Sequence, residues 1–156
     1  GETGETGEDT GEGPLTTVYV VRHAEKDSGS NPGLTEQGAA RAQALAVRMD
    51  DVVLDAIYAT EFRRTQETVQ PTADAKDMEV LVDIEPKEEL PALILDSHVG
   101  DTILHAGHSF TIPSFMENIG ADEAPALSGY GQLWILSIQD GEVIEVDLET
   151  FSAPDE

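Results

Sequence analysis

Short apolar runs alternate along this chain with segments whose apolar residues recur at helical spacing, and this alternation restricts the possible folds more than any other feature. The run "TTVYVV" at 16–21 is typical of a buried strand. Three further strands are predicted at 55–60, 78–84 and 101–107. Strands that alternate with helices predict a mainly parallel sheet covered on both faces, so we expect an α/β fold built as a three-layer α/β/α sandwich.

Helix and turn signals fill the segments between these strands. Helices are predicted at 34–51, from about 60 to 71, at 87–97 and at 109–119. Thr35 is a suitable N-cap for the first helix, with Leu34 as its hydrophobic staple. The second helix should stop before Pro71 or shortly after it, because proline lacks the backbone N–H that a helix interior needs. Asp140-Gly141, between two apolar runs, predicts a C-terminal hairpin that adds antiparallel strands.

Composition limits the chain to one folded domain. The first 13 residues, "GETGETGEDTGEG", contain only Gly, Glu, Thr and Asp, so we expect a disordered acidic tail before a single domain over residues 14–156. A chain of 156 residues has no room for a second domain of ordinary size. The absence of cysteine excludes disulfides, thiolate catalysis and cysteine-ligated zinc.

The charge balance is strongly acidic, with 8 basic and 32 acidic residues and a net charge of −24. Nucleic acid is therefore not an expected partner, since phosphate backbones bind basic surfaces. The simplest interpretation is an acidic soluble protein. A sharper one is adaptation to high salt, because ~1 M salt reduces the screening length to about 3 Å and so weakens the repulsion between surface carboxylates.

No segment predicts a membrane span, since no window reaches the ~18 consecutive apolar residues that a span requires. The compartment stays open from the sequence. We expect the cytoplasm, and the acidic tail suggests a processed exported or lipid-anchored form as the alternative. The sequence also leaves the oligomeric state open.

Basic side chains gather where the predicted strands end, although the chain has few of them. Arg22 and His23 follow the first strand, Arg63 and Arg64 follow the second, and His108 follows the fourth. The carboxyl ends of parallel strands meet at one edge of a sheet, where ligands bind. Arginine forks match phosphate oxygens in pairs, and a neutral imidazole is a good nucleophile near pH 7. The sequence therefore predicts a phosphate site with a covalent histidine mechanism.

Three motifs at these strand ends resemble those of the histidine phosphatase superfamily, which includes phosphoglycerate mutases and phosphohistidine phosphatases. "VYVVRHAEK" resembles its Arg-His-(Gly/Ala) signature, "YATEFRRTQET" its Ser-Ser-x-x-x-Arg-Ala-x-x-Thr box, and "GHS" its Gly-His-(Ser/Gly) box. The motifs occur in the family's order within residues 16–149. Ala59 and Thr60 stand where two serines are common, and Thr65 stands in place of alanine.

The resemblance implies a role for each matched residue. His23 corresponds to the nucleophile that forms a phosphohistidine, and Arg22 to the first phosphate-binding arginine. Arg64 corresponds to the catalytic arginine and Arg63 to the variable position before it. His108 corresponds to the second histidine, which faces the phosphate. No metal or cofactor is implied, because the arginines and histidines supply the positive charge.

The general acid is the role that the motifs assign least directly. In the family an acidic residue after the third strand protonates the leaving oxygen, and Glu85 lies there, followed by Glu88 and Glu89. Glu85 is our first candidate and Glu88 the second. The alternative is that all three are acids at the start of a helix, where they favour the helix dipole.

These observations predict a metal-independent phosphatase that hydrolyses a phosphomonoester or phosphohistidine on a small molecule or a phosphoprotein. The alternatives are phosphoglycerate mutase-like phosphoryl transfer and a non-catalytic phosphate-binding or phosphoprotein-binding module. The mutases usually carry extra helical segments over the site, whereas the connections here are short. We expect His105 to lie in the core or behind the site, His98 to be exposed to solvent, and Tyr130 and Trp134 to lie in the core or at the rim.

Overall fold

The computed structural model describes residues 13–121, 124–126 and 129–152. The predicted acidic tail therefore lies outside the described residues, apart from Gly13. Within the described part, no helix has the length and apolar character needed to cross a membrane.

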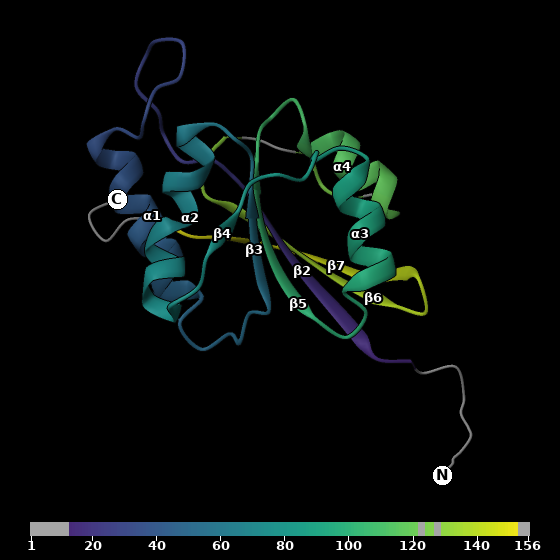
Figure 1. The fold of residues 1–156 in the computed structure, drawn as a ribbon. Coiled ribbons are helices and arrows are strands. Elements are labelled where there is room, and N and C mark those ends of the chain that lie inside the picture. Colours follow the sequence, from purple (N-terminus) through teal and green to yellow (C-terminus); the bar gives the residue numbers. More distant parts are fainter. Residues whose placement is uncertain (1–12, 122–123, 127–128, 153–156) are drawn as a thin grey trace.

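A six-stranded sheet in the order β4-β3-β5-β2-β6-β7 forms the centre of the protein (Figure 1). Its strands are β2 (Leu15–Arg22), β3 (Ala56–Ala59), β4 (Val80–Leu81), β5 (Thr102–Gly107), β6 (Gln132–Gln139) and β7 (Glu142–Thr150). The first four strands are parallel to one another, and β6 runs antiparallel to both β2 and β7. This sheet confirms the predicted mainly parallel arrangement with a C-terminal hairpin.

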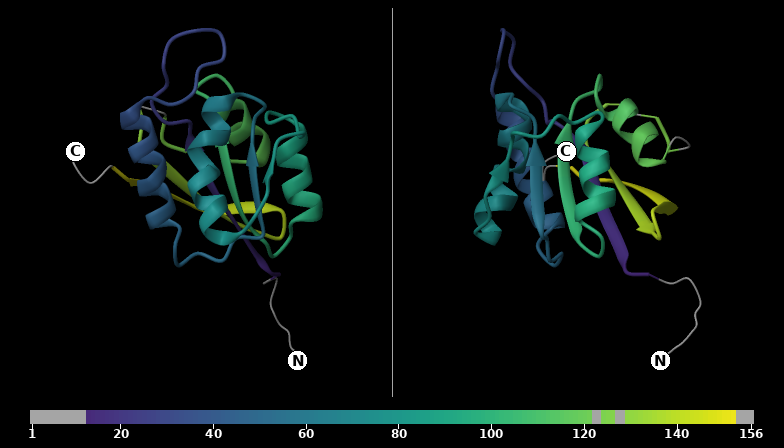
Figure 2. Two further views of the ribbon diagram at one scale, coloured as in Figure 1. Left: turned by 60° about the vertical axis from the view of Figure 1, so that its left-hand side comes forward. Right: turned by 45° about the vertical axis from the view of Figure 1, so that its right-hand side comes forward.

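Helices cover both faces of the sheet, which confirms the three-layer sandwich (Figure 2). The helices are α1 (Glu36–Arg48), α2 (Arg63–Lys76), α3 (Glu89–Ser97) and α4 (Ile112–Ile119). One core contains Leu45 of α1 and Val69 of α2 packed against Ile57 and Leu104 of the sheet. The other contains Ile94 of α3 and Phe115 of α4 packed against Val18 and Trp134. The alternating side chains of the central strands thus bury both faces.

The first helix begins as predicted. Thr35 is its N-cap, and the Thr35 side chain accepts a hydrogen bond of 3.0 Å from the Gly38 N–H. At the other end of the chain, Asp140 and Gly141 both have positive φ, of 55° and 79°, as the two-residue turn of a hairpin requires.

Several boundaries differ from the prediction. α2 continues past Pro71 to Lys76, because buried Val69, Thr72 and Ala73 extend its apolar face on both sides of the proline. β4 contains only two residues instead of the predicted 78–84, since it lies at the sheet edge and pairs only with β3. α4 begins at Ile112 rather than near Ser109, after a turn that contains His108.

His98 is not exposed to solvent, which corrects the sequence prediction. Its side chain is only 16% exposed, because the turn after α3 folds the ring against β3. The Nε2 atom lies 2.7 Å from the Tyr58 hydroxyl, and the Nδ1 atom lies 2.8 Å from an Asp101 carboxylate oxygen. His98 therefore ties the end of α3 to the sheet.

Candidate active site

The site lies where the chain leaves two neighbouring strands in opposite directions. From β2 the chain crosses through α1 to β3, whereas from β5 it crosses through α4 to β6 on the other side of β2. Ligands of open α/β sheets bind in the crevice at the carboxyl ends of such strands. Here the His23 N–H donates a 2.9 Å hydrogen bond to the Gly107 carbonyl, so the two predicted histidines, His23 and His108, follow adjacent strand ends.

His23 is held in one tautomer by its own loop. The ring is buried, and its Nδ1 atom lies 2.8 Å from the Ala24 carbonyl oxygen. Because a carbonyl oxygen can only accept, Nδ1 carries the proton and Nε2 keeps its lone pair. Burial, together with the nearby Arg22 and Arg64 guanidinium groups, lowers the pKa of His23 to about 4. Near pH 7 the side chain is therefore a neutral imidazole with an unprotonated Nε2.

The residue after His23 is held in place by the second motif. The Ala24 N–H donates a 2.8 Å hydrogen bond to the Thr68 hydroxyl, which donates in turn to the Arg64 carbonyl at 2.7 Å. Thr68 thus joins the histidine loop to the helix that carries the arginine. No role for Thr68 was predicted from the sequence, although Thr68 occupies the threonine position of the second motif.

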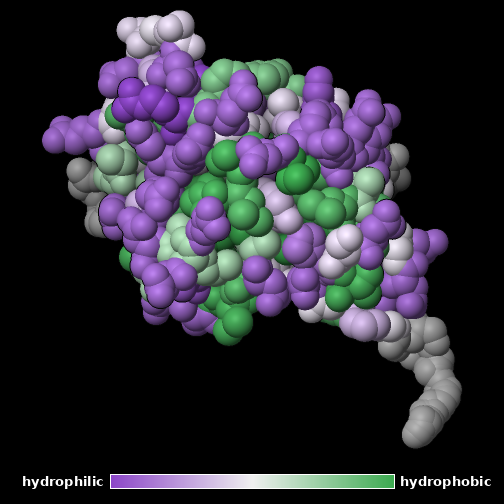
Figure 3. Space-filling model, viewed as in Figure 1, coloured by the Kyte–Doolittle hydropathy of each residue, from purple (hydrophilic) through white to green (hydrophobic). Residues whose placement is uncertain are grey.

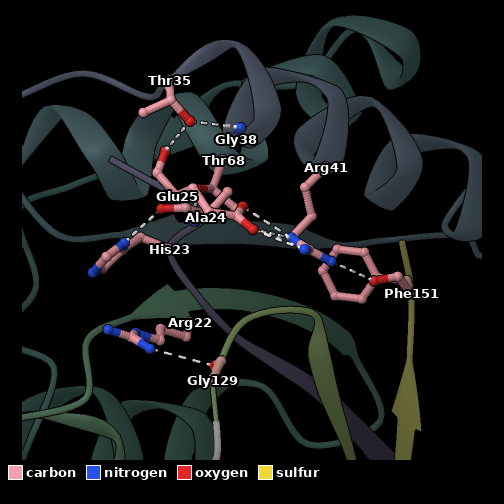
Figure 4. A network of polar contacts seen from close by, with 10 residues as sticks. All are labelled: Arg22, His23, Ala24, Glu25, Thr35, Gly38, Arg41, Thr68, Gly129 and Phe151. Carbon is pink, nitrogen blue, oxygen red and sulfur yellow. Dashed lines mark hydrogen bonds and ion pairs between the residues drawn. The ribbon is translucent and has the colours of Figure 1, made fainter. Parts of the chain in front are cut away.

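Glu25 anchors the same loop to α1 and to the C-terminal segment (Figure 4). Its carboxylate accepts two charge-assisted bonds from Arg41, at 2.9 Å from Nε and 2.7 Å from Nη2. Arg41 also donates to the Phe151 carbonyl at 2.9 Å. A Cβ atom at Gly38 would clash with the Glu25 carbonyl, so this close approach of helix and loop requires glycine.

Two arginines supply positive charge at the site. The Nε atoms of Arg22 and Arg64 are buried and have no hydrogen-bond partner within the described residues. Arg22 is stacked at 4.3 Å on the Tyr130 ring, and Arg64 at 4.6 Å on the Phe62 ring. Buried donors without a partner are rare in native proteins, so these nitrogens are suited to bind an anion.

The neighbouring Arg63 is oriented differently. Its side chain is exposed and pairs with Glu67 one helical turn away, at 3.1 Å. The structure thus separates Arg64, at the site, from Arg63, on the surface of α2.

Tyr130 contacts the site more closely than the sequence indicated. Besides stacking on Arg22, its ring lies 6.0 Å from the His23 ring, centroid to centroid. No motif surrounds Tyr130, and the segment that carries it is far from the other site residues in sequence, so no sequence signal identified this role. Trp134, by contrast, lies in the core.

His108 faces His23 across the site, with 5.4 Å between the ring centroids. Its Nε2 atom lies 2.8 Å from the Thr60 hydroxyl, which lies 2.7 Å from the Thr65 hydroxyl. The His108 Nδ1 atom is buried and has no partner in the described part of the chain. Burial, together with the nearby Arg64 guanidinium group, lowers the pKa of His108 to about 3. The two motif departures, Thr60 and Thr65, therefore form a hydroxyl pair that orients this second histidine.

His105 lies on the opposite face of β5 from the α1–α2 core. It is fully buried, its ring lies 4.9 Å from the Phe115 ring, and burial lowers its pKa to about 4. This position in the core agrees with the expectation from strand alternation.

Glu85 caps a helix. Its carboxylate accepts backbone hydrogen bonds from Lys87 at 2.9 Å, Glu88 at 2.7 Å and Glu89 at 3.0 Å. These N–H groups at the start of α3, those of Glu88 and Glu89 above all, lower the pKa of Glu85. The Glu89 carboxylate accepts in return from the Glu85 N–H at 2.9 Å. This environment favours the ionised form and does not suit a proton donor, so it supports the helix-start interpretation rather than the general-acid one.

The assembled side chains are suited to bind a tetrahedral oxyanion and to attack it. An unprotonated imidazole nitrogen, two guanidinium groups and a second histidine lie at the ends of three strands. Among the residues that the structure describes, no three His, Cys, Asp or Glu side chains cluster as a metal site would require.

Comparison with known families agrees with this geometry. The family model of the histidine phosphatase superfamily (branch 1) matches residues 18–91, which contain the first two motifs and the segment up to α3. Over this segment, which is just under half of the chain, the sequence is similar to the histidine phosphatase superfamily. This similarity supports phosphatase activity in general. Among curated protein sequences, none matches this chain.

Solved structures share this fold over nearly the whole domain. The protein histidine phosphatase SixA complexed with tungstate is similar, with a TM-score of 0.69, 15% identity, and coverage of 89% of this chain and 97% of that one. A putative phosphohistidine phosphatase SixA from Agrobacterium tumefaciens has a TM-score of 0.64, 21% identity, and coverage of 88% and 98%. Phosphoglycerate mutase from Bacillus anthracis str. Sterne has a TM-score of 0.64, 13% identity, and coverage of 89% and 93%. These likenesses show a common fold.

Proposed function

We propose that this protein is a metal-independent phosphatase that transfers a phosphoryl group to His23 and then to water. One observation carries the proposal. The Ala24 carbonyl holds the proton on Nδ1 of His23, which leaves a neutral Nε2 nucleophile next to two arginines with unpartnered buried nitrogens. A neutral nucleophile beside fixed cations is the combination that phosphoryl transfer requires.

The reaction has two balanced steps. In the first, His23 Nε2 forms a bond to phosphorus while the bond from phosphorus to the leaving group breaks, and Arg22 and Arg64 bind the equatorial oxygens. The leaving atom keeps the bonding electrons and takes a proton. In the second, a water oxygen attacks phosphorus and the N–P bond breaks, which releases inorganic phosphate and a proton and restores His23. Splitting the displacement in this way replaces one difficult step by two easier ones.

The environment of Glu85 favours phosphohistidine over a phosphomonoester. An alkoxide leaving group needs a proton in the transition state, whereas a phosphorylated imidazole that carries a proton on its other ring nitrogen departs as a neutral ring. The N–H groups at the start of α3 donate to the Glu85 carboxylate and lower its pKa, which favours the ionised form. The Glu89 carboxylate accepts a hydrogen bond from the Glu85 N–H. A substrate that leaves without a strong general acid suits such a site, so phosphohistidine is the substrate class that we propose first.

Short connections around the site favour hydrolysis over mutase chemistry. The described residues form no helix beyond the four that pack on the sheet, so none of these residues adds a helical segment over the site. A phosphoenzyme exposed to water is hydrolysed, whereas a mutase must return the group to an intermediate. We therefore place phosphoglycerate mutase-like transfer second.

The test is the hydrolysis of phosphoramidate and of a phosphohistidine peptide in the presence of EDTA, with wild type and His23→Ala compared. We expect turnover by wild type, an acid-labile phosphoryl group on the protein, and loss of both in His23→Ala. Equal turnover by both proteins would disprove the nucleophile assignment. Tungstate binding by wild type without any turnover would favour the non-catalytic binding module.

A further inference from the structure

A cavity of about 520 Å³ opens beside the proposed phosphate site. Three segments that are far apart in sequence line it: the β3–α2 connection, the β4–α3 connection and the turn after β5. They contribute Glu61, Phe62, Asp83, Lys87, His108 and Phe110. On the face of the molecule shown in Figure 3, apolar residues gather near β4 and the segment after it, within a hydrophilic surround.

The cavity lies on the His108 side of the site. His108 lines it, whereas His23, Arg22 and Arg64 do not. His108 is 0% exposed, and its Nδ1 atom has no partner among the described residues. In an in-line displacement the leaving group departs on the side of phosphorus opposite to the nucleophile. A phosphoryl group attacked by His23 would thus direct its leaving group past His108 into this cavity.

Two phenylalanines form aromatic walls beside His108. The Phe110 ring is stacked on the His108 ring at 4.5 Å, and Phe62 meets it edge-on at 5.1 Å. Phe110 is nevertheless 61% exposed, so it presents an apolar face to a ligand. An aromatic surface of this kind accepts a planar ring.

The charges around these walls are mostly negative. Glu61, Asp83, Glu85 and Glu89 line the cavity, against a single cation, Lys87. The carboxylates of Glu85 and Glu89 are bound within the α3 cap, whereas Glu61 and Asp83 are exposed. The cavity is therefore unfavourable for leaving groups with carboxylates or further phosphates and favourable for cationic ones.

We infer that this cavity binds the polypeptide side of the substrate, as a segment whose phosphorylated ring packs on Phe62 and Phe110 and whose flanking lysines or arginines pair with Glu61 and Asp83. This inference rests on the proposed function and adds the class of substrate, a phosphohistidine segment with a basic flank. It places anionic small esters such as phosphoglycerate among the poor substrates.

The experiment measures kcat/KM for three substrates at low salt. Two are phosphohistidine peptides of equal length, one with lysine flanks and one with glutamate flanks. The third is phosphoramidate, which has a P–N bond but no ring and no flank. The enzymes are wild type, the double variant Glu61→Gln/Asp83→Asn, Phe110→Ala, and the control Glu142→Gln/Glu145→Gln. The control removes two exposed carboxylates from β7, at the opposite edge of the sheet from β4.

We expect wild type to prefer the lysine peptide, and the cavity double variant to lose about fivefold of this preference, as two exposed ion pairs would give. The control should keep the full preference. Phe110→Ala should lower kcat/KM for both peptides by about fivefold more than for phosphoramidate, the loss expected from one aromatic contact with the substrate ring.

Two results would overturn the inference while phosphoramidate turnover continues. One is equal rates for the two peptides. The other is an equal loss of preference in the control, which would assign the effect to the charge of the whole molecule. Loss of His23-dependent turnover on all three substrates would instead count against the proposed function itself.

Discussion

At the scale of single residues, two adjacent arginines show how one position in a helix decides a role. Arg63 and Arg64 have the same side chain, but they are consecutive residues at the start of α2, so the two side chains point in different directions. Arg63 lies on the surface beside Glu67, and Arg64 has a buried Nε atom without a partner in the described chain.

Arg64→Ala should therefore lower kcat/KM by at least about 10²-fold, the usual cost of removing one group that stabilises transition-state charge. Arg63→Ala should stay within about twofold, since an exposed i,i+4 pair contributes little. Steady-state kinetics on phosphoramidate measures both variants, with melting temperatures to verify folding. The reverse order of effects would show that Arg63 is the phosphate ligand.

A second prediction at this scale concerns His105 and the pH dependence of the free energy of unfolding. Burial holds the pKa of His105 at about 4 in the folded protein, below the ordinary value of 6.5. The unfolded chain therefore binds a proton more readily, and the contribution of neutral His105 is complete above pH 6.5 and is lost as the pH falls toward 4.

Between pH 7 and pH 4 the free energy of unfolding of wild type should fall by up to about 3 kcal/mol relative to His105→Leu. Denaturant unfolding of the two proteins across this range gives the difference directly. The comparison cancels the carboxylates, which titrate in both proteins. Parallel stability profiles would contradict the buried neutral state of His105.

At the scale of secondary-structure elements, the buried pair of Glu25 and Arg41 joins α1, the loop that carries His23 and the segment after β7. The side chains are only 15% and 10% exposed, and Arg41 also binds the Phe151 carbonyl. Removal of one partner leaves a buried charge without compensation, whereas removal of both does not.

Arg41→Met should accordingly lower the free energy of unfolding by about 3 kcal/mol, and Glu25→Leu/Arg41→Met by less than the sum of the single variants. Because the loop then loses its anchor to α1, kcat should fall in Arg41→Met while the Kd for tungstate changes little. If the losses in free energy of unfolding were fully additive, or if only the affinity for tungstate fell, then Glu25 and Arg41 would not be positioning residues.

The sequence predicted most elements because each rests on local signals. Apolar runs identified the strands, and Thr35 identified the start of α1. The motifs at the strand ends named His23, Arg22, Arg64 and His108. Their positions follow from topology, since a parallel sheet brings successive strand ends to one edge.

The remaining features depend on tertiary contacts. α2 continues through Pro71 because packing of its buried face offsets the lost backbone bond. Glu85 stood at the predicted position for an acid, but the N–H groups of α3 that its carboxylate caps decide its chemistry. Tyr130 reaches Arg22 from a loop that no pattern connects to β2. Interactions of this kind require the folded chain.

At the scale of the whole molecule, the net charge is −24, and the acidic residues that contribute to it include those of β7, most of whose residues are exposed. Carboxylates along an edge strand also discourage pairing with another sheet. Within one molecule, however, such charges repel one another over the screening length.

The melting temperature should consequently rise as NaCl increases from about 0.01 M to 1 M, because the screening length shrinks from about 30 Å to about 3 Å. A series in sucrose at matched osmolality serves as the control for general exclusion effects. An equal rise in both series would mean that repulsion among carboxylates does not limit stability, and would count against adaptation to high salt.

The hydrogen bond from His23 to the Ala24 carbonyl has a consequence for the lifetime of the phosphoenzyme. A phosphorylated imidazole carries more positive character than the free ring, and a neutral carbonyl compensates that charge less than a carboxylate would. The same ring lies near two guanidinium groups that already disfavour its cation. In the proposed reaction the phosphohistidine intermediate is thus reactive and transfers its phosphoryl group to water quickly. The phosphoenzyme should therefore be short-lived and should not accumulate.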